Sequence, residues 1–144
     1  MKKNFAKAVW EGNLAKGTGK IEIDSIGFTE NYNFGSRFEE GQGTNPEQLI
    51  GAAHAGCFSM ALAHALSEKG FVPKEVLTKA EVTLEKGTNG FRISNIYLKT
   101  KCRVPKVDEK TFWDLADEAK INCPVSKALA GTNIELEASL IKEP

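Results

Sequence analysis

Hydrophobic and polar residues alternate in several stretches of the chain, and this pattern predicts strands with one solvated face. The alternation runs over residues 20–24, 79–85, 96–104 and 134–140. The second and third stretches flank the sequence GTNG at 87–90, which favours a hairpin between them. A run of β-strands therefore opens the chain, a hairpin occupies its middle and a last strand closes it.

One long helix is predicted between the first strands and the hairpin. Thr44 or Asn45 can cap its start, and Pro46 suits the first helical position. Gly70 supplies a stop after about Lys69. Most of the stretch is uncharged and rich in alanine and glycine, so we expect this central helix to be buried on most sides.

The remaining segments complete an α+β fold. Residues 35–45 are rich in glycine and charge without a period, which predicts a loop. Residues 108–120 predict an amphipathic helix, and Pro124 suits the start of a further helix, which places Cys123 at or beside an N-cap. No repeat or linker interrupts the sequence, so we expect a single domain over residues 1–144.

Composition and charge narrow the classes of partner. The 144 residues include 19 basic and 19 acidic side chains, so the chain has no net charge with which to attract nucleic acid or an anionic membrane. The start of the chain lacks an apolar stretch of signal-peptide length, and no run is expected to approach a membrane span. We therefore expect a cytoplasmic protein whose partners are small molecules or other proteins.

Three cysteines, at positions 57, 102 and 123, are the main candidates for chemistry. An odd number in a chain of this length argues against a structural disulfide framework. Cys102 lies on the apolar face of a predicted strand, where a cysteine acts as a small hydrophobic residue. Cys123 is different, because a helix N-terminus favours the nucleophilic thiolate, although it can equally be an inert cap.

Cys57 lies in the central helix on a stripe with two histidines. Helical projection aligns it with Glu47, His54 and His64. His54 can act as a base toward Cys57, the two can begin a metal site, or the histidines can be satisfied core residues. The spacing His-x-x-Cys supplies only two ligands and no orienting third group, so residue patterns alone favour structural histidines and leave Cys57 open between packing and chemistry.

Four motifs resemble the OsmC branch of the OsmC/Ohr family. They are AVWEG (8–12), RFEEG (37–41), GTNPEQLIGAAHAGCFSMAL (43–62) and CPVSKAL (123–129), in the expected order. The resemblance implies an OsmC-like α+β fold, with antiparallel sheets around a long buried central helix, and an intertwined homodimer. It extends from near the start through most of the chain.

The resemblance also implies a thiol peroxidase that reduces organic hydroperoxides, and hydrogen peroxide less well, in the stress defence of bacteria. Cys57 resembles the peroxidatic cysteine and Cys123 the resolving cysteine, which together form an intrasubunit disulfide. Arg37 and Glu47 resemble the pair that polarises the site. From the residues themselves, Glu47 can hold the guanidinium by bidentate contact, and it can equally serve as a first-turn acid of the helix. The family assigns no role to the histidines or to Cys102, needs no metal or cofactor, and points to a lipoyl-type dithiol as reductant.

Helix geometry adds an expectation about the assembly. Glu47 and Cys57 are ten residues apart, which is about 15 Å along a continuous helix. If both serve one site, the Arg37–Glu47 pair comes from a second subunit, with two central helices meeting about a two-fold axis.

Apolar residues near these positions suggest a hydrophobic pocket that prefers alkyl hydroperoxides. They are Phe34 and Phe38 beside Arg37, with Phe58, Met60 and Leu62 beside Cys57. Two other functions use the same cysteines: a dithiol–disulfide oxidoreductase with no peroxide step, and a redox sensor without turnover.

Overall fold

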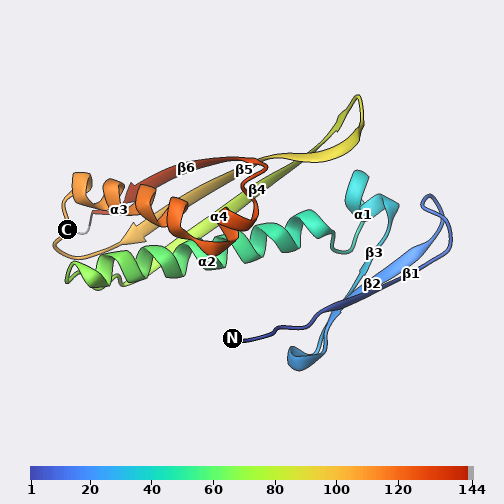
Figure 1. Cartoon of the computed structure of the whole chain (residues 1–144), viewed down its shortest axis with the longest axis horizontal. Coiled ribbons are helices and arrows are strands. Elements are labelled where there is room, and N and C mark those ends of the chain that lie inside the picture. The colour runs from blue at the N-terminus through green and yellow to red at the C-terminus, as the bar shows by residue number, and fades with distance from the viewer. Residues whose placement is uncertain (143–144) are drawn as a thin grey trace. The chain divides into compact units, whose positions relative to one another are not determined.

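The computed structural model describes residues 1–142. The chain divides into two compact units, an N-terminal unit, Met1–Leu49, and a C-terminal unit, Ile50–Pro144. The single domain expected over residues 1–144 stays a prediction. Figure 1 shows the elements of both units.

The N-terminal unit is built on a three-stranded antiparallel meander in the order β1-β2-β3. Its elements are β1 (Lys7–Glu11), β2 (Thr18–Ile23), a short 3-10 helix η1 (Asp24–Ile26) and β3 (Phe28–Tyr32). The rings of Trp10 and Tyr32 close over Gly19, where an added Cβ would lie 2.5 Å from the Tyr32 ring and 2.8 Å from the Trp10 ring. Only glycine fits between these two aromatic side chains.

A short helix, α1 (Phe34–Phe38), forms where a loop is expected over residues 35–45. Its start is a capping box: the Asn33 side chain accepts the N–H of Ser36 at 2.8 Å, and the Ser36 hydroxyl accepts the N–H of Asn33 at 2.9 Å. Reciprocal capping satisfies two N–H groups that a helix start leaves open. The expectation of a loop is therefore wrong for this part of the segment.

The central helix is α2 (Pro46–Glu68), close to the predicted bounds. Asn45 is the cap, since its side chain accepts the N–H of the third helical residue at 2.8 Å. At the other end Gly70 has a φ of 86°, and the N–H of Phe71 donates to the carbonyl of Leu66 at 3.0 Å. This is a Schellman ending, which favours glycine because its backbone is left-handed.

The C-terminal unit has a three-stranded sheet in the order β4-β5-β6. Its elements are β4 (Glu75–Gly87), β5 (Gly90–Arg103), α3 (Glu109–Asn122), α4 (Pro124–Ala128) and β6 (Asn133–Leu140). The predicted hairpin is confirmed, with β4 and β5 antiparallel. However, β6 pairs parallel to β5, so the expectation of purely antiparallel sheets is wrong here, because α3 and α4 form a crossover between the two strands.

One face of this sheet carries the core, and Figure 1 shows α2, α3 and α4 together beside the three strands. Alternate residues of β5 face inward, and their partners on β4 and β6 lie on the same face. The buried apolar side chains are Phe58, Leu62 and Leu66 of α2, Ile96, Leu98 and Cys102 of β5, Phe112, Leu115, Ala116 and Ala119 of α3, and Val104 and Val107. The opposite face carries charged side chains, so the sheet has one buried face and one solvent-exposed face.

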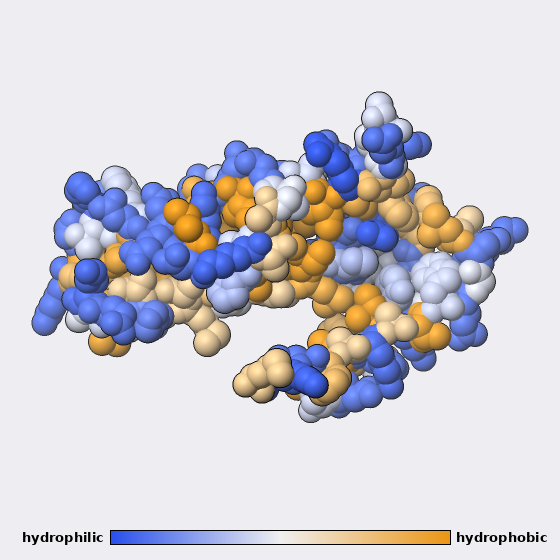
Figure 2. All heavy atoms as spheres, in the orientation of Figure 1, coloured by the Kyte–Doolittle hydropathy of each residue, from blue (hydrophilic) through white to orange (hydrophobic). Residues whose placement is uncertain are grey.

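The other face of α2 is open. Ala52, Ala53, Gly56 and Met60 are exposed, with Met60 at 77%, and Figure 2 shows apolar atoms at the surface over this helix. Within the C-terminal unit, the sheet covers the stripe of α2 that includes Phe58, and these exposed residues lie outside that contact.

Helix α2 is also long and apolar enough to cross a membrane, judged by length and composition alone. The expectation that no run approaches a membrane span is wrong by that criterion. The core helix of a protein that does not enter membranes passes the same test, and Phe58, Leu62 and Leu66 are fully buried in the core. One face of α2 is thus part of the core of the C-terminal unit.

Candidate active site

Two of the three cysteines meet in the C-terminal unit. The Sγ atoms of Cys57 and Cys123 lie 2.9 Å apart in hydrogen-bonding contact, although 66 residues separate them in sequence. Both are free thiols, Cys57 half-buried and Cys123 fully buried. Such a pair is positioned to form a disulfide after a small movement.

Cys123 is positioned by the junction of two helices. Its N–H donates to the carbonyl of Ala119 at 3.0 Å and ends α3, while its carbonyl accepts the N–H of Lys127 at 3.1 Å and begins α4. Pro124 is the first residue of α4, where its missing N–H costs nothing. The predicted place of Cys123 at a helix N-cap is confirmed.

The surroundings of the two thiols shift their pKa values in opposite directions. Burial raises the pKa of Cys57, and the hydrogen bond with Cys123 raises it further, against an opposing effect of the Val125 N–H. Burial also acts to raise the pKa of Cys123, but hydrogen bonds with Cys57 and Ser126 outweigh it and hold this pKa below its usual value. The C-terminal unit alone therefore favours a thiolate at Cys123, and activation of Cys57 needs a further cation.

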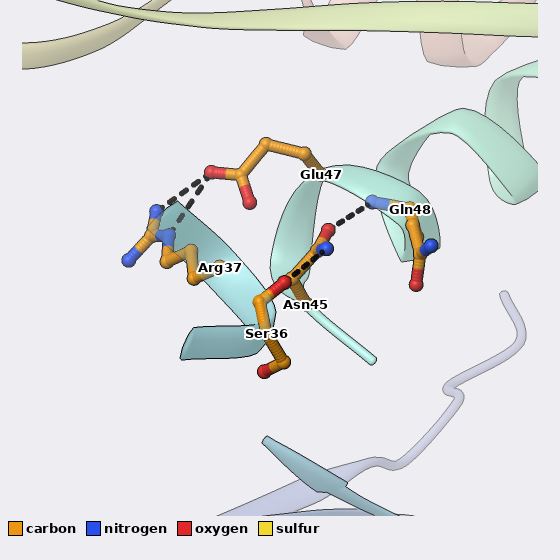
Figure 3. A network of polar contacts seen from close by, with 5 residues as sticks. All are labelled: Ser36, Arg37, Asn45, Glu47 and Gln48. Carbon is orange, nitrogen blue, oxygen red and sulfur yellow. Dashed lines mark hydrogen bonds and ion pairs between the residues drawn. The ribbon is translucent and has the colours of Figure 1, made fainter. Parts of the chain in front are cut away.

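Arg37 and Glu47 form an ion pair within the N-terminal unit (Figure 3). The Arg37 Nε and one terminal nitrogen donate to Glu47 Oε1 at 3.1 and 2.8 Å. Both nitrogens share this one oxygen, so the expected bidentate contact with two carboxylate oxygens is not formed. Glu47 Oε2 is buried without a hydrogen-bond partner among residues 1–142, which leaves one acceptor of the pair available.

The ion pair is held in place by the capping residues around it. The Asn45 side chain donates to the carbonyl of Ser36 at 2.9 Å, while its oxygen accepts the N–H of Gln48 at 2.8 Å (Figure 3). One side chain thus joins α1, which carries Arg37, to the first turn of α2, which carries Glu47. The guanidinium orientation is fixed by this local structure.

A pocket of about 270 Å³ lies beside Arg37 in the same unit. Its lining is mainly aromatic and consists of Trp10, Leu14, Tyr32, Asn33, Phe34, Arg37 and Phe38. The Phe34 and Phe38 ring centroids are 4.9 Å apart, and the Arg37 guanidinium carbon lies 5.4 Å from the Phe38 ring centre. An apolar group and a negatively charged or polar group can bind here side by side.

The histidines and Cys102 occupy different environments. His54 is fully buried, and its Nε2 lies 2.8 Å from the Ser126 hydroxyl. His64 is exposed, and its Nε2 lies 3.9 Å from Glu68 Oε1. Cys102 is buried in the core, and burial raises its pKa. Within residues 1–142 no cluster of three or more His, Cys, Asp or Glu residues can hold a metal.

Sequence reasoning missed the contact between His54 and Ser126. The position of Ser126 beside Cys123 could have been predicted, because the residue three places after an N-cap lies beside the cap. The approach of His54 to Ser126 depends on how α4 packs against α2, and no local sequence pattern predicts that packing. Helix α1 was missed because its glycine, Gly35, and the charged, glycine-rich sequence after it resemble a loop.

Two thiols in contact at the end of α3, beside a central helix on a mixed sheet, define an α+β protein of the cysteine redox class. The family described as OsmC-like protein matches residues 39–138. That match covers more than half of the chain, so the chain belongs to the OsmC-like protein family, as the motifs indicated.

Known proteins support this assignment. Peroxiredoxin OsmC of Escherichia coli is 47% identical over 124 residues, 85% of this chain and 87% of that protein. Organic hydroperoxide resistance protein OhrB of Bacillus subtilis is 33% identical over 132 residues, 90% of this chain and 88% of that protein.

Solved structures agree on the fold. The crystal structure of OhrB of Bacillus subtilis has a TM-score of 0.65 at 27% identity, covering 95% of this chain and 98% of that one. An OsmC-like protein from Mycoplasma pneumoniae has a TM-score of 0.76 at 18% identity, covering 98% and 99%. The second likeness shows the fold alone.

Proposed function

We propose that this protein is a thiol-dependent peroxidase that reduces organic hydroperoxides, and hydrogen peroxide less efficiently, to alcohols or water. The observation that carries the proposal is the 2.9 Å contact between Cys57 and Cys123. Relatives named peroxiredoxin and organic hydroperoxide resistance protein support it.

The reaction uses the two thiols in turn. The Cys57 thiolate attacks the outer oxygen of the hydroperoxide, the O–O bond breaks, and the leaving alkoxide takes a proton to give an alcohol. Cys57 is then a sulfenic acid. The Cys123 sulfur attacks it, an S–S bond forms, the S–O bond breaks and water leaves. A lipoyl-type dithiol reopens the disulfide by exchange and is itself oxidised.

Arg37 supplies the cation that Cys57 lacks within the C-terminal unit. A guanidinium beside a thiol lowers the pKa of that thiol and stabilises charge on a leaving oxygen. Glu47 holds the guanidinium through the contacts at 3.1 and 2.8 Å. The aromatic pocket beside Arg37 takes the alkyl group of the substrate, and so favours organic hydroperoxides over hydrogen peroxide.

A second copy of the chain brings the ion pair to the thiols. Glu47 and Cys57 belong to one continuous helix, and ten residues correspond to about 15 Å along it. The open face of α2, with small residues and Met60, suits packing against the same face of a partner helix. We propose an intertwined homodimer in the cytoplasm, with each chain as one domain over residues 1–144.

Turnover with a set of serine variants tests this function. We expect wild-type protein to consume cumene hydroperoxide with dihydrolipoamide as reductant, and Cys57→Ser and Cys123→Ser to lose steady turnover. Cys102→Ser is the matched control, because Cys102 is a buried thiol outside the pair, and it should retain activity.

The other outcomes separate the alternatives. Reduction of disulfides without any reaction with hydroperoxide would indicate a dithiol–disulfide oxidoreductase. Stoichiometric formation of the Cys57–Cys123 disulfide without repeated turnover on an adequate dithiol would indicate a redox sensor.

A further inference from the structure

A buried histidine lies beside the thiol pair without an assigned task. His54 precedes Cys57 by three residues on α2 and has no exposed surface. Its Nε2 lies 2.8 Å from Ser126 Oγ, and its Nδ1 has no hydrogen-bond partner among residues 1–142. Burying an imidazole with one nitrogen unpartnered costs stability, so packing alone is a poor reason for a histidine at this position.

Ser126 connects this histidine to the resolving thiol. Ser126 is the third residue of α4, the helix that Cys123 caps, and its side chain is buried. Its side chain forms a hydrogen bond with Cys123 that acts to lower the pKa of that thiol. A continuous chain of polar contacts therefore runs from Cys123 through the Ser126 hydroxyl to His54.

The proposed reaction needs a proton acceptor at this end of the pair. In the proposed reaction the cation beside Cys57 moves the negative charge to that sulfur, so the proton shared across the 2.9 Å contact then lies on Cys123. Once Cys57 has become a sulfenic acid, Cys123 must lose this proton, since the thiolate is the nucleophile. Cys123 is fully buried, so bulk water does not take the proton directly.

We propose that His54, acting through the hydroxyl of Ser126, accepts the proton that Cys123 must lose before the disulfide forms. His54 is thus a positioning residue for the resolving step. The inference rests on the proposed peroxidase function and deepens it, because it assigns a group to the second half of the cycle.

The proton and electron balance is complete within this arrangement. The Cys123 S–H proton passes to Ser126 Oγ while the Ser126 O–H proton passes to His54 Nε2. The electron pair left on the Cys123 sulfur attacks Cys57 Sγ, the S–S bond forms, and the S–O bond breaks. The departing hydroxide takes the proton back from His54 through the Ser126 hydroxyl, which gives water and a neutral imidazole.

The electrostatic surroundings suit this task. Burial lowers the pKa of His54, so the imidazole is neutral near pH 7 and can accept a proton. The two thiols nearest to it along the contacts described above are Cys57, three residues further along α2, and Cys123, which is reached through Ser126. Burial is the cause of the shift, so a charged neighbour does not hold the proton on the ring beforehand.

Two single-turnover measurements test the relay. The first follows sulfenic acid and then disulfide formation after one equivalent of cumene hydroperoxide, by rapid quench with a thiol-blocking reagent and mass spectrometry. We expect His54→Gln and Ser126→Ala to form the sulfenic acid at the wild-type rate and the disulfide about 100-fold more slowly at pH 7. Ser126→Thr keeps the hydroxyl and should retain the fast step.

The pH profile separates a relay from a structural role. In His54→Gln the slow step should accelerate as the pH rises above 7 and level off once the Cys123 thiol ionises without help, whereas the wild-type rate should change little. A loss of folding would instead slow the step at every pH. His64→Gln is the matched control, since His64 is exposed on the same helix, and it should behave as wild type.

The second measurement does not require peroxide. A chromogenic aromatic disulfide reacts with Cys57, and attack by Cys123 then releases a second chromophore at a rate that reports the same thiol. If wild-type protein failed to react with hydroperoxide, the function would be wrong while this release still tested the relay. A wild-type rate of disulfide formation in His54→Gln in both measurements would overturn the proposal.

Discussion

The N-terminal and C-terminal units differ in what holds them together. The buried residues of the N-terminal unit are Gly19, Ser36, Thr44 and Glu47, whereas large buried side chains such as Phe58 lie in the C-terminal unit. A three-stranded sheet with no apolar core of its own depends on further surface for its stability. The unit that carries the Arg37–Glu47 pair is therefore also the unit that most needs a partner.

This difference divides the chemistry. The C-terminal unit packs two thiols in contact but raises the pKa of Cys57. The N-terminal unit holds a cation oriented by a buried carboxylate. Neither unit contains an activated peroxidatic thiol, and we infer that assembly of two copies creates it.

The largest expected effect is on the stability of the C-terminal unit. Phe58→Ala empties the centre of the core and should lower the free energy of unfolding by about 3–5 kcal/mol, measured by urea denaturation. Phe5→Ala is the matched control in the N-terminal unit, because Phe5 is 80% exposed, and should change stability by less than about 0.5 kcal/mol. Equal losses in the two variants would contradict the contrast between the units.

The next effect concerns the ion pair. Arg37→Ala should reduce peroxide turnover by about 100-fold and raise the pKa of Cys57, which thiolate absorbance against pH will measure. Arg92→Ala removes an exposed arginine that lies near Glu85 and should leave both quantities unchanged. An unchanged Cys57 pKa in Arg37→Ala would remove the activating role.

A smaller effect is expected at the open face of α2. Met60→Asp places a charge at the centre of the proposed helix contact and should weaken dimerisation by at least about tenfold, measured by sedimentation. Val72→Asp changes a residue of similar exposure, 75%, that lies beyond the end of the helix. If both variants dimerise as wild type does, another face forms the interface.

The smallest effect is a pH dependence of stability from His54. Burial lowers its pKa in the folded state, so below about pH 6.5 the unfolded chain binds the proton more readily. The free energy of unfolding therefore decreases as the pH falls from the pKa of the unfolded state toward that of the folded state, and above the pKa of the unfolded state His54 does not change it. Urea midpoints measured from pH 8 to pH 5 should fall less steeply in His54→Gln than in wild type, and equal slopes would contradict this.

Local signals in the sequence were enough for much of this structure. The ends of α2 follow from Pro46 and Gly70, and the place of Cys123 follows from Pro124, because caps and breakers act within one turn. The parallel pairing of β6 and the contact between His54 and Ser126 were not predictable in this way. Each depends on packing between segments distant in sequence.

A mixed dimer tests the central claim most directly. Arg37→Ala and Cys57→Ser chains with different affinity tags are co-expressed, and the heterodimer is purified and assayed for hydroperoxide turnover. If Arg37 of one copy activates Cys57 of the other, one of the two sites in each heterodimer is intact, and about half of the wild-type activity returns. If Arg37 acts on the thiol of its own chain, both sites are broken, and the heterodimer will be as inactive as its parents.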